Sequence, residues 1–278
     1  MKIILKKEES STSVLLFIFN IIYSRTQKES LHLSSLLEIM EKFGKSESAT
    51  RMALSRACKS NILSTHRVGK DVVYSINSKA LSHINTWNLN ARYLWQRLSM
   101  RKSDWNHNWH MVNISISDFD KRDLIDERIQ QFAYVRVDAQ TWVGPYQHLE
   151  EIKSVLNELA EDTNLISITG ALDSNLDIER HLMNKYRLAQ LYPLYENFNQ
   201  TYQTLLIDIE DDQTILSNGN SLSILHKLGY AYFGIASNDP MLPQSILPNW
   251  PGDQAAELMQ KLRTHIEAYA WDYLKNFD

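Results

Sequence analysis

One segment of the chain carries side chains suited to contact with DNA. Between residues 46 and 60, small and apolar side chains recur at helical spacing, and the opposite face carries serine, arginine and lysine. Arginine and serine can hydrogen-bond base edges in a groove, and lysine can neutralise phosphates. With the basic hairpin that follows, these types predict a DNA-contacting set: Lys45, Ser48, Arg51, Met52, Ser55, Arg56, Lys59, Arg67 and Lys70. We assign base edges to Arg51 and Ser55, and phosphates to Arg67 and the three lysines.

A helix and a hairpin must hold these side chains. Ser46 is a suitable N-cap for a helix that begins near Glu47, and the stripe this helix should bury is Thr50, Ala53, Leu54 and Ala57. Residues 62–66 and 72–76 have the character of strands, and residues 68–71 supply a glycine-containing turn between them. The expected order is therefore a helix followed by a two-stranded hairpin.

Two helical patterns precede this segment, at 13–24 and 31–43, and the second ends at Gly44, a natural helix terminus. Three helices and a hairpin in this order predict a winged helix-turn-helix. Two alternatives stay open: an amphipathic helix packed on a surface hairpin without a nucleic-acid role, and a winged helix that binds protein.

Charge is distributed unevenly along the chain. The net charge is −4, but residues 1–102 hold 17 lysines and arginines against 7 acidic residues, and residues 103–278 hold 12 against 26. A basic half joined to an acidic half is typical of a nucleic-acid-binding module attached to a sensing or assembly module. Phosphate contacts would supply most of the non-specific affinity.

Composition predicts an intracellular protein without a disulfide framework. The single cysteine, Cys58, fits a reducing cytoplasm and is interpreted as an ordinary small side chain. The apolar run Val14–Tyr23 is shorter than the roughly 20 residues that cross a bilayer, so we expect a buried helix there.

Beyond the hairpin, residues 78–102 have the pattern of a long connector helix. Residues 110–117 alternate as a strand, 118–133 are helical, 134–143 are strand-like, 148–161 are helical and 165–170 form a further strand. This order resembles a small ferredoxin-like unit. In the remainder, we expect one or two helices over 178–207 with a break at Tyr192-Pro193, then helices at 221–236 and 252–275. The predicted class is α+β and multidomain, divided as 1–80, 81–104, 105–175 and 176–278.

Three motifs in order resemble the PaaX family of transcriptional regulators, the phenylacetate-catabolism repressor type. They are the winged-helix segment, the Trp105–Val112 stretch followed by Thr141–Pro145, and the string from Asp239 through Pro243 to Ile246–Gly252. The last, DPMLP followed by LPNWPG, is the most specific. Pro240, Pro243 and Pro248 predict a rigid connector, which we favour over a direct contact with an effector.

The resemblance implies a homodimeric repressor that binds double-stranded operator DNA and is released by an aryl-CoA effector such as phenylacetyl-CoA. It also implies a winged helix, a ferredoxin-like middle domain and a helical C-terminal domain. The chain has few cations in its second half that could receive CoA phosphates: Lys185 and Arg187, with Arg180 and Lys227 beside them. Five tryptophans near the predicted domain junction could line an aromatic pocket or form a packed interface: Trp87, Trp95, Trp105, Trp109 and Trp142. The effector-binding candidates are Trp105, Trp109, Trp142, Lys185 and Arg187.

Enzyme chemistry has weaker support. His107 and His110, with His148 or Asp118, could in principle ligate a metal, but the flanking tryptophans favour aromatic packing. Asp118 and Asp120 allow a second reading, a metal-dependent nuclease in the middle domain, which would require several converging carboxylates. Helix capping by Asp118 is the simpler explanation. We expect neither catalysis, a bound metal nor a cofactor.

Overall fold

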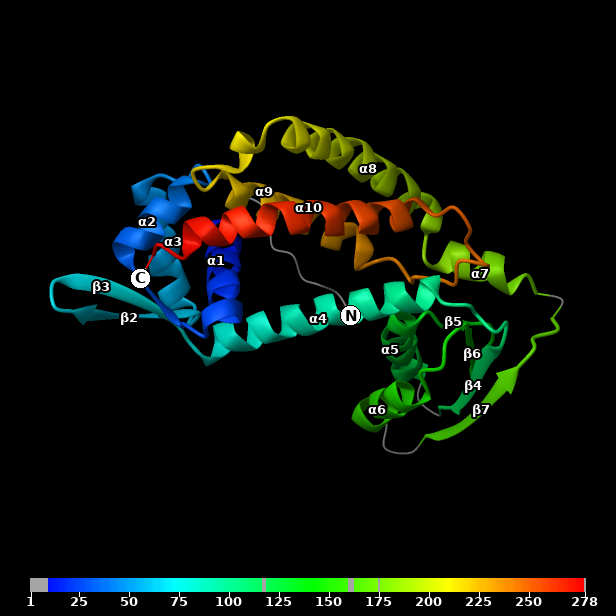
Figure 1. The fold of residues 1–278 in the computed structure, drawn as a ribbon. Helices are drawn as coiled ribbons and strands as arrows, with labels where there is room; N and C mark the ends of the chain where they lie inside the picture. The colour runs from blue at the N-terminus through cyan, green and yellow to red at the C-terminus, as the bar shows by residue number, and fades with distance from the viewer. Residues whose placement is uncertain (1–9, 117–118, 160–162, 175, 278) are drawn as a thin grey trace. The chain divides into compact units, whose positions relative to one another are not determined.

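The computed structural model describes residues 10–116, 119–159, 163–174 and 176–277 (Figure 1). These residues form ten α-helices, two short 3-10 helices and two antiparallel sheets, so the protein is of the α+β class. They divide into two compact units. The unit within 10–92, 195–235 and 252–277 is called the helical unit, and the unit within 93–194 and 236–251 is called the sheet unit.

The N-terminal part of the helical unit holds three helices and a small sheet. Its elements are α1 (Ser11–Thr26), β1 (Ser30–His32), α2 (Leu33–Glu41), α3 (Glu47–Lys59), β2 (Leu63–Val68) and β3 (Asp71–Ile76). The apolar run expected to form a buried helix does so in α1, whose buried side chains are Val14, Leu15, Ile18, Phe19 and Ile22. No helix among the described residues is long and apolar enough to cross a bilayer.

The sheet of this part has the order β1-β3-β2, with both pairings antiparallel. Strand β1 is a correction, because the sequence pattern assigned residues 31–43 to one helix and the structure gives Ser30–His32 to the sheet. A three-residue strand is too short to show a period of two, and only its pairing with β3 defines it.

The turn between α2 and α3 joins them through a left-handed residue. Gly44 has φ +67°, its N–H donates to the Glu41 carbonyl, and the Lys45 N–H donates to the Met40 carbonyl. This pattern is a Schellman motif, which satisfies carbonyls at the end of α2. Gly44 is therefore the helix terminus that the sequence predicted, and α3 begins three residues later.

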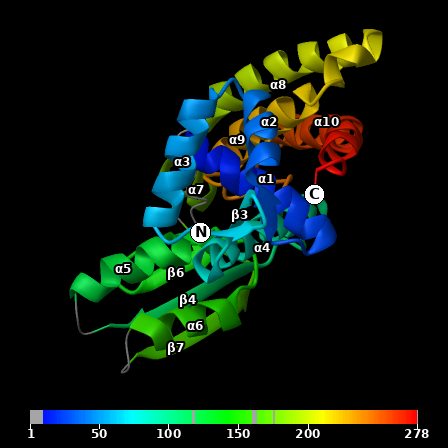
Figure 2. The same cartoon turned by 90° about the vertical axis from the view of Figure 1, so that its left-hand side faces the viewer.

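The rest of the helical unit consists of long helices from the second half of the chain. They are the C-terminal part of α8 (Leu188–Asp211), the 3-10 helix η2 (Gln213–Leu216), α9 (Asn220–Ala236) and α10 (Pro251–Leu274). In Figures 1 and 2, helices α9 and α10 lie beside α1 and α2 of the same unit. Phe198 of α8 packs on Tyr232 of α9 with ring centroids 5.7 Å apart, which joins α8 to α9. Helix α4 (Ser78–Lys102) begins in this unit and ends in the sheet unit.

The break expected at Pro193 is wrong. Helix α7 (Ile178–Lys185) ends before Arg187, whose φ is +52°, and Pro193 lies inside α8. Near the start of a helix, a proline removes a single hydrogen bond, here the one to the Ala189 carbonyl, and α8 tolerates that loss.

The sheet unit is built on four strands and two covering helices. Its elements in order are β4 (Trp109–Ser115), α5 (Phe119–Ile129), η1 (Gln130–Phe132), β5 (Val135–Arg136), β6 (Thr141–Gly144), α6 (Leu149–Leu159) and β7 (Asn164–Gly170). The strand order is β5-β6-β4-β7, and every neighbouring pair is antiparallel. Apolar side chains from one face of β4 and β6 meet those of α5 and α6 in one core, which includes Val112, Ile125, Trp142 and Ile152.

The single strand expected over 134–143 is also wrong, because the structure divides it into β5 and β6. Asp138 causes the interruption: its Oδ1 accepts hydrogen bonds from the backbone N–H groups of Gln140 (2.7 Å) and Thr141 (2.8 Å). Those bonds lower the pKa of Asp138 and stabilise a tight turn. Asp138 was the local signal for this hairpin.

Gly44→Ala tests the turn between α2 and α3. A side chain at φ +67° is strained, so the free energy of unfolding should fall by about 1–2 kcal/mol in urea denaturation. The matched control is Gly229→Ala inside α9, where no atom lies within 4 Å of the added Cβ. Alanine there should stabilise the protein by about 0.5–1 kcal/mol. Equal effects of the two substitutions would contradict the left-handed turn.

Candidate nucleic-acid interface

Helix α3 separates its side chains into two faces. Thr50, Ala53, Leu54 and Ala57 are buried, and α3 packs with this stripe against α1 and α2. The other face is exposed, and it carries all six helical residues predicted to contact DNA: Ser48, Arg51, Met52, Ser55, Arg56 and Lys59. Met52 is unusual there, since 57% of this large apolar residue is exposed.

The first turn of α3 is organised by Ser46 and Glu47. The Ser46 Oγ accepts a hydrogen bond from the Ala49 N–H at 3.3 Å, which makes Ser46 the predicted N-cap. Glu47 Oε1 accepts from Arg51 at Nε (2.8 Å) and lies 2.7 Å from its Nη2. Both side chains are more than half exposed, so this ion pair contributes little stability and Arg51 can leave it for another acceptor. Sequence analysis did not single out Glu47, although its i,i+4 spacing from Arg51 was the available signal.

The hairpin of β2 and β3 carries the remaining predicted cations. Beyond Leu63, every residue of β2 is exposed, including Arg67, and Lys70 is exposed in the turn beside Gly69 at φ +63°. The base of the hairpin is closed by Asn77, the residue before α4, whose side chain donates to Asn61 Oδ1 at 2.9 Å. Lys45 differs from the other eight residues, because it lies in the α2–α3 turn and is half-buried.

The tryptophans of the predicted effector site have different surroundings. Trp105 and Trp109 form an edge-to-face pair with centroids 5.2 Å apart, and Trp105 Nε1 donates to the Pro145 carbonyl at 2.9 Å. Trp142 is fully buried in the core of the sheet unit, where its Nε1 donates to Asp126 Oδ1 at 2.9 Å. Trp87 packs on Phe233 in the helical unit. A ligand could reach the half-buried Trp105–Trp109 pair more easily than Trp142.

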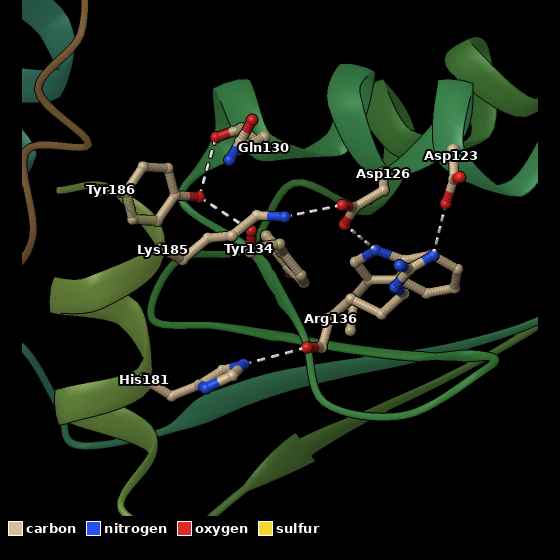
Figure 3. Close-up of polar contacts among 9 residues, drawn as sticks. Asp123, Asp126, Gln130, Tyr134, Arg136, His181, Lys185 and Tyr186 are labelled. Carbon is tan, nitrogen blue, oxygen red and sulfur yellow. Dashed lines mark hydrogen bonds and ion pairs between the residues drawn. The ribbon is translucent and has the colours of Figure 1, made fainter.

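Lys185 is engaged within the sheet unit. Its Nζ lies 2.8 Å from Asp126 Oδ2, so one buried carboxylate accepts from both Lys185 and Trp142 (Figure 3). A ligand phosphate would have to compete with Asp126 for this cation. Arg187 is exposed at the junction of α7 and α8.

Two further side chains hold α7 and the residue after it against η1, β5 and the residues between them (Figure 3). The Tyr186 hydroxyl donates to the carbonyls of Gln130 (2.9 Å) and Tyr134 (2.8 Å), and burial raises the pKa of Tyr186. His181 Nε2 lies 3.2 Å from the Arg136 carbonyl oxygen. These contacts give α7 a defined position, because each satisfies a backbone carbonyl that would otherwise need water.

In the proline-rich loop after α9, the buried carboxylate accepts hydrogen bonds from other residues of the same loop. Asp239 is buried, and its carboxylate accepts from the Met241 N–H at 2.8 Å and from Trp250 Nε1 at 2.7 Å. The fully buried Arg101 donates to the Leu242 and Leu247 carbonyls, the latter at 2.8 Å. This geometry fits the rigid connector that the prolines predicted. The helical pattern of residues 78–102 gives no sign that Arg101 is buried, because its burial depends on the packing of this loop on α4.

The histidines of the metal hypothesis have other partners. His107 packs against the Trp105 ring, His110 Nδ1 lies 2.9 Å from Thr169 Oγ1, and His148 stacks on Phe132. Within the described ranges, no three His, Cys, Asp or Glu side chains gather as a metal site would require. Asp118, the residue of the capping and nuclease hypotheses, lies outside the described residues.

Cys58 is half-buried, and burial raises the pKa of its thiol. The neutral thiol therefore predominates at pH 7, which disfavours nucleophilic or redox-sensor chemistry.

Known proteins share this organisation. Residues 11–80 match the family described as PaaX-like protein, and residues 186–276 match the PaaX-like protein C-terminal domain. The transcriptional repressor PaaX of Escherichia coli (strain K12) is 24% identical over 233 residues, which cover 81% of this chain and 71% of the relative. The structure of the uncharacterized protein Rv0674 from Mycobacterium tuberculosis has a TM-score of 0.55 at 18% identity, covering 95% of this chain and 99% of that one. That last likeness concerns the fold alone.

A PaaX-like N-terminal segment joined to a PaaX-like C-terminal domain defines a transcriptional regulator. The chain belongs to the PaaX family.

Lys185→Met tests the ion pair with Asp126. The substitution leaves a carboxylate in a mostly buried position, where it still accepts a hydrogen bond from Trp142 Nε1. Because Lys185 is about one-third exposed, we expect the free energy of unfolding to fall by about 1–3 kcal/mol, less than for a fully buried pair. Lys153→Met, which breaks an exposed pair with Glu150, is the control and should change it by less than about 0.5 kcal/mol. Similar losses would mean that the Lys185 pair behaves as a surface pair.

Proposed function

We propose that this protein is a transcriptional repressor that binds operator DNA through α3 and the β2–β3 hairpin. The observation that carries the proposal is the exposed face of α3, where serine and arginine side chains lie over a stripe of small buried residues. The family assignment and the printed function of the Escherichia coli relative support the same role. The genes it controls, by analogy with that family, belong to phenylacetate or related aromatic-acid catabolism, and such a regulator acts in the cytoplasm.

The DNA-binding segment acts as a winged helix-turn-helix. Helix α3 enters the major groove with Arg51 and Ser55 toward base edges, and Met52 is suited to apolar contact with a thymine methyl group. Arg67 and Lys70 on the hairpin contact the phosphate backbone, as do Lys45 and Lys59 near the two ends of α3. The excess of cations over residues 1–102 supplies long-range attraction to the duplex.

We further propose the remaining domains as a connector over 81–104, a ferredoxin-like domain over 105–175 and a helical domain over 176–278. The order β4, α5, β5, β6, α6, β7, with β5-β6-β4-β7 as the strand order, supports the ferredoxin-like assignment. A homodimer would place two copies of α3 on the two halves of a palindromic operator.

An aryl-CoA thioester such as phenylacetyl-CoA is the proposed effector. The Trp105–Trp109 pair is half-buried and could receive an aryl group, and the exposed Arg187 and Arg180 could receive phosphates. Lys185 could join them only by exchanging Asp126 for phosphate. The effector would release DNA by binding one pose of the two winged domains better than the other.

The function is tested by fluorescence polarisation with DNA from upstream of the gene and its neighbouring operons, at about 150 mM salt because affinity depends steeply on salt. We expect tight, sequence-selective binding that phenylacetyl-CoA reverses. Selective binding that phenylacetyl-CoA leaves unchanged would keep the repressor and reject this effector. The absence of selective binding to every fragment would reject DNA-binding repression itself.

Arg51→Ala and Lys70→Ala should affect DNA binding differently. Loss of a base-reading arginine should cost about 1–3 kcal/mol on the operator and relax preference at one base pair. Loss of a phosphate contact should weaken all sequences about equally and reduce the salt slope by about one. A panel of single-base operator variants measures both effects. A change of sequence preference in Lys70→Ala would show that the hairpin assignment is wrong.

A further inference from the structure

The turn that leads into α3 rests on a residue from the second half of the chain. His226 of α9 meets the ring of Phe17 on α1, with centroids 4.9 Å apart, and the ring of Phe43 in the turn, with centroids 5.8 Å apart. Phe17 and Phe43 also meet each other edge-to-face at 6.2 Å. These three rings are called the turn seat. They bring three separate elements of the helical unit together beneath the start of α3.

The turn also contacts the C-terminal helix. Lys42 Nζ lies 5.8 Å from the centroid of the Tyr273 ring on α10, and the Tyr273 hydroxyl lies 3.5 Å from Glu38 Oε1 on α2. Figure 1 shows the end of α10 beside α2. Gly219, at φ +82°, allows this approach, since a Cβ there would lie 2.9 Å from the Tyr273 ring. Helices α9 and α10 thus both contact the turn, and both lie outside residues 11–80.

His226 occupies the seat as an uncharged ring. It is 8% exposed, and burial, followed by the charges of Lys227 and Lys45, lowers its pKa to about 4. Lys45 follows Phe43 by two residues and directly precedes the N-cap Ser46, so a shift of Phe43 would move Lys45 and the start of α3 together.

We propose that His226, through Phe43, is a positioning residue that holds Lys45 and the first turn of α3 in their DNA-binding pose. The inference rests on the proposed DNA-binding function and deepens it, because it makes α9 part of the machinery of the interface. A change in α9 would then alter operator affinity without any contact between α9 and DNA. His226 touches no DNA in this account and acts only through the turn.

A purely structural role would have a different signature. If His226 only stabilised the fold, its replacement would lower the unfolding temperature and reduce the fraction of active protein, with the same effect on every DNA contact. If His226 positions Lys45, replacing His226 should remove mainly the operator affinity that Lys45 contributes, because residues that act through one contact are energetically coupled. The coupling between His226 and Lys45, rather than the size of the loss of affinity, therefore distinguishes a positioning role from a structural one.

Two double-mutant cycles on the full-length chain make the test, with operator affinity and its salt slope as readouts. His226→Leu puts an apolar side chain in place of the ring. It is combined with Lys45→Ala in one cycle and with Lys70→Ala in the other. We expect His226→Leu to weaken binding about fivefold, within the range of coupling between contacting residues, and to reduce the salt slope by about one. In the His226→Leu background, Lys45→Ala should weaken operator binding by less than about a further twofold. Lys70→Ala should weaken it in that background as much as it does in the parent chain.

Two more variants complete the experiment. His226→Phe restores an aromatic ring and should recover most of the affinity, which also gives a folded comparison if His226→Leu proves unstable. His265→Ala replaces an exposed histidine of the same unit whose hydrogen bond lies within α10, and this variant should bind as the parent does. Wild-type affinity in His226→Leu, or additive losses in both cycles, would overturn the positioning role while leaving DNA binding intact. If the parent chain itself bound no operator, the proposed function and this inference would fail together.

Discussion

The central constraint in this molecule is the short turn between α2 and α3. Within the five residues 42–46 the chain must satisfy the last carbonyls of one helix, reverse direction and satisfy the first N–H groups of the next. Gly44 solves the first problem through its left-handed backbone, and the Ser46 hydroxyl solves the second. The exposed face of α3 has a defined orientation only because this turn has a defined shape, and the rings of Phe17, Phe43 and His226 hold it from below.

In the sheet unit, buried polar groups hold the surrounding segments in place, as the turn between α2 and α3 does in the helical unit. Asp126 is buried with Trp142 and Lys185 as partners, and Asp239 is buried with Trp250 and the Met241 N–H. An unpartnered carboxylate at either position would be costly, so each specifies one arrangement of the surrounding segments. Arg101 does the same for the loop before α10 by donating to two of its carbonyls. Rigid attachment of this kind suits a protein whose proposed effector must shift a defined pose.

The distribution of charge links the two halves of the proposed mechanism. In the proposed mechanism the exposed cations of α3 and its hairpin would attract phosphates, and Arg51 would exchange its exposed ion pair with Glu47 for a base. In the second half, Lys185 is already paired with Asp126, and several exposed cations are ion-paired as well, among them Lys153 with Glu150 and Lys261 with Glu210. An anionic effector would therefore meet a sparse set of cations in a mostly acidic half.

Local pattern determined much of this protein before any tertiary contact was known. Helical spacing identified the buried and exposed faces of α3, Gly44 and Ser46 marked the ends of two helices, and family motifs identified the regulator. These features depend on neighbours within a few residues, which is why the sequence shows them. The tertiary structure alone decided the three-residue strand β1, the burial of Arg101, the pairing of Lys185 with Asp126 and the position of His226 beneath the turn. Each of these features joins residues far apart in the chain, and a local sequence pattern does not show which distant residues will come into contact.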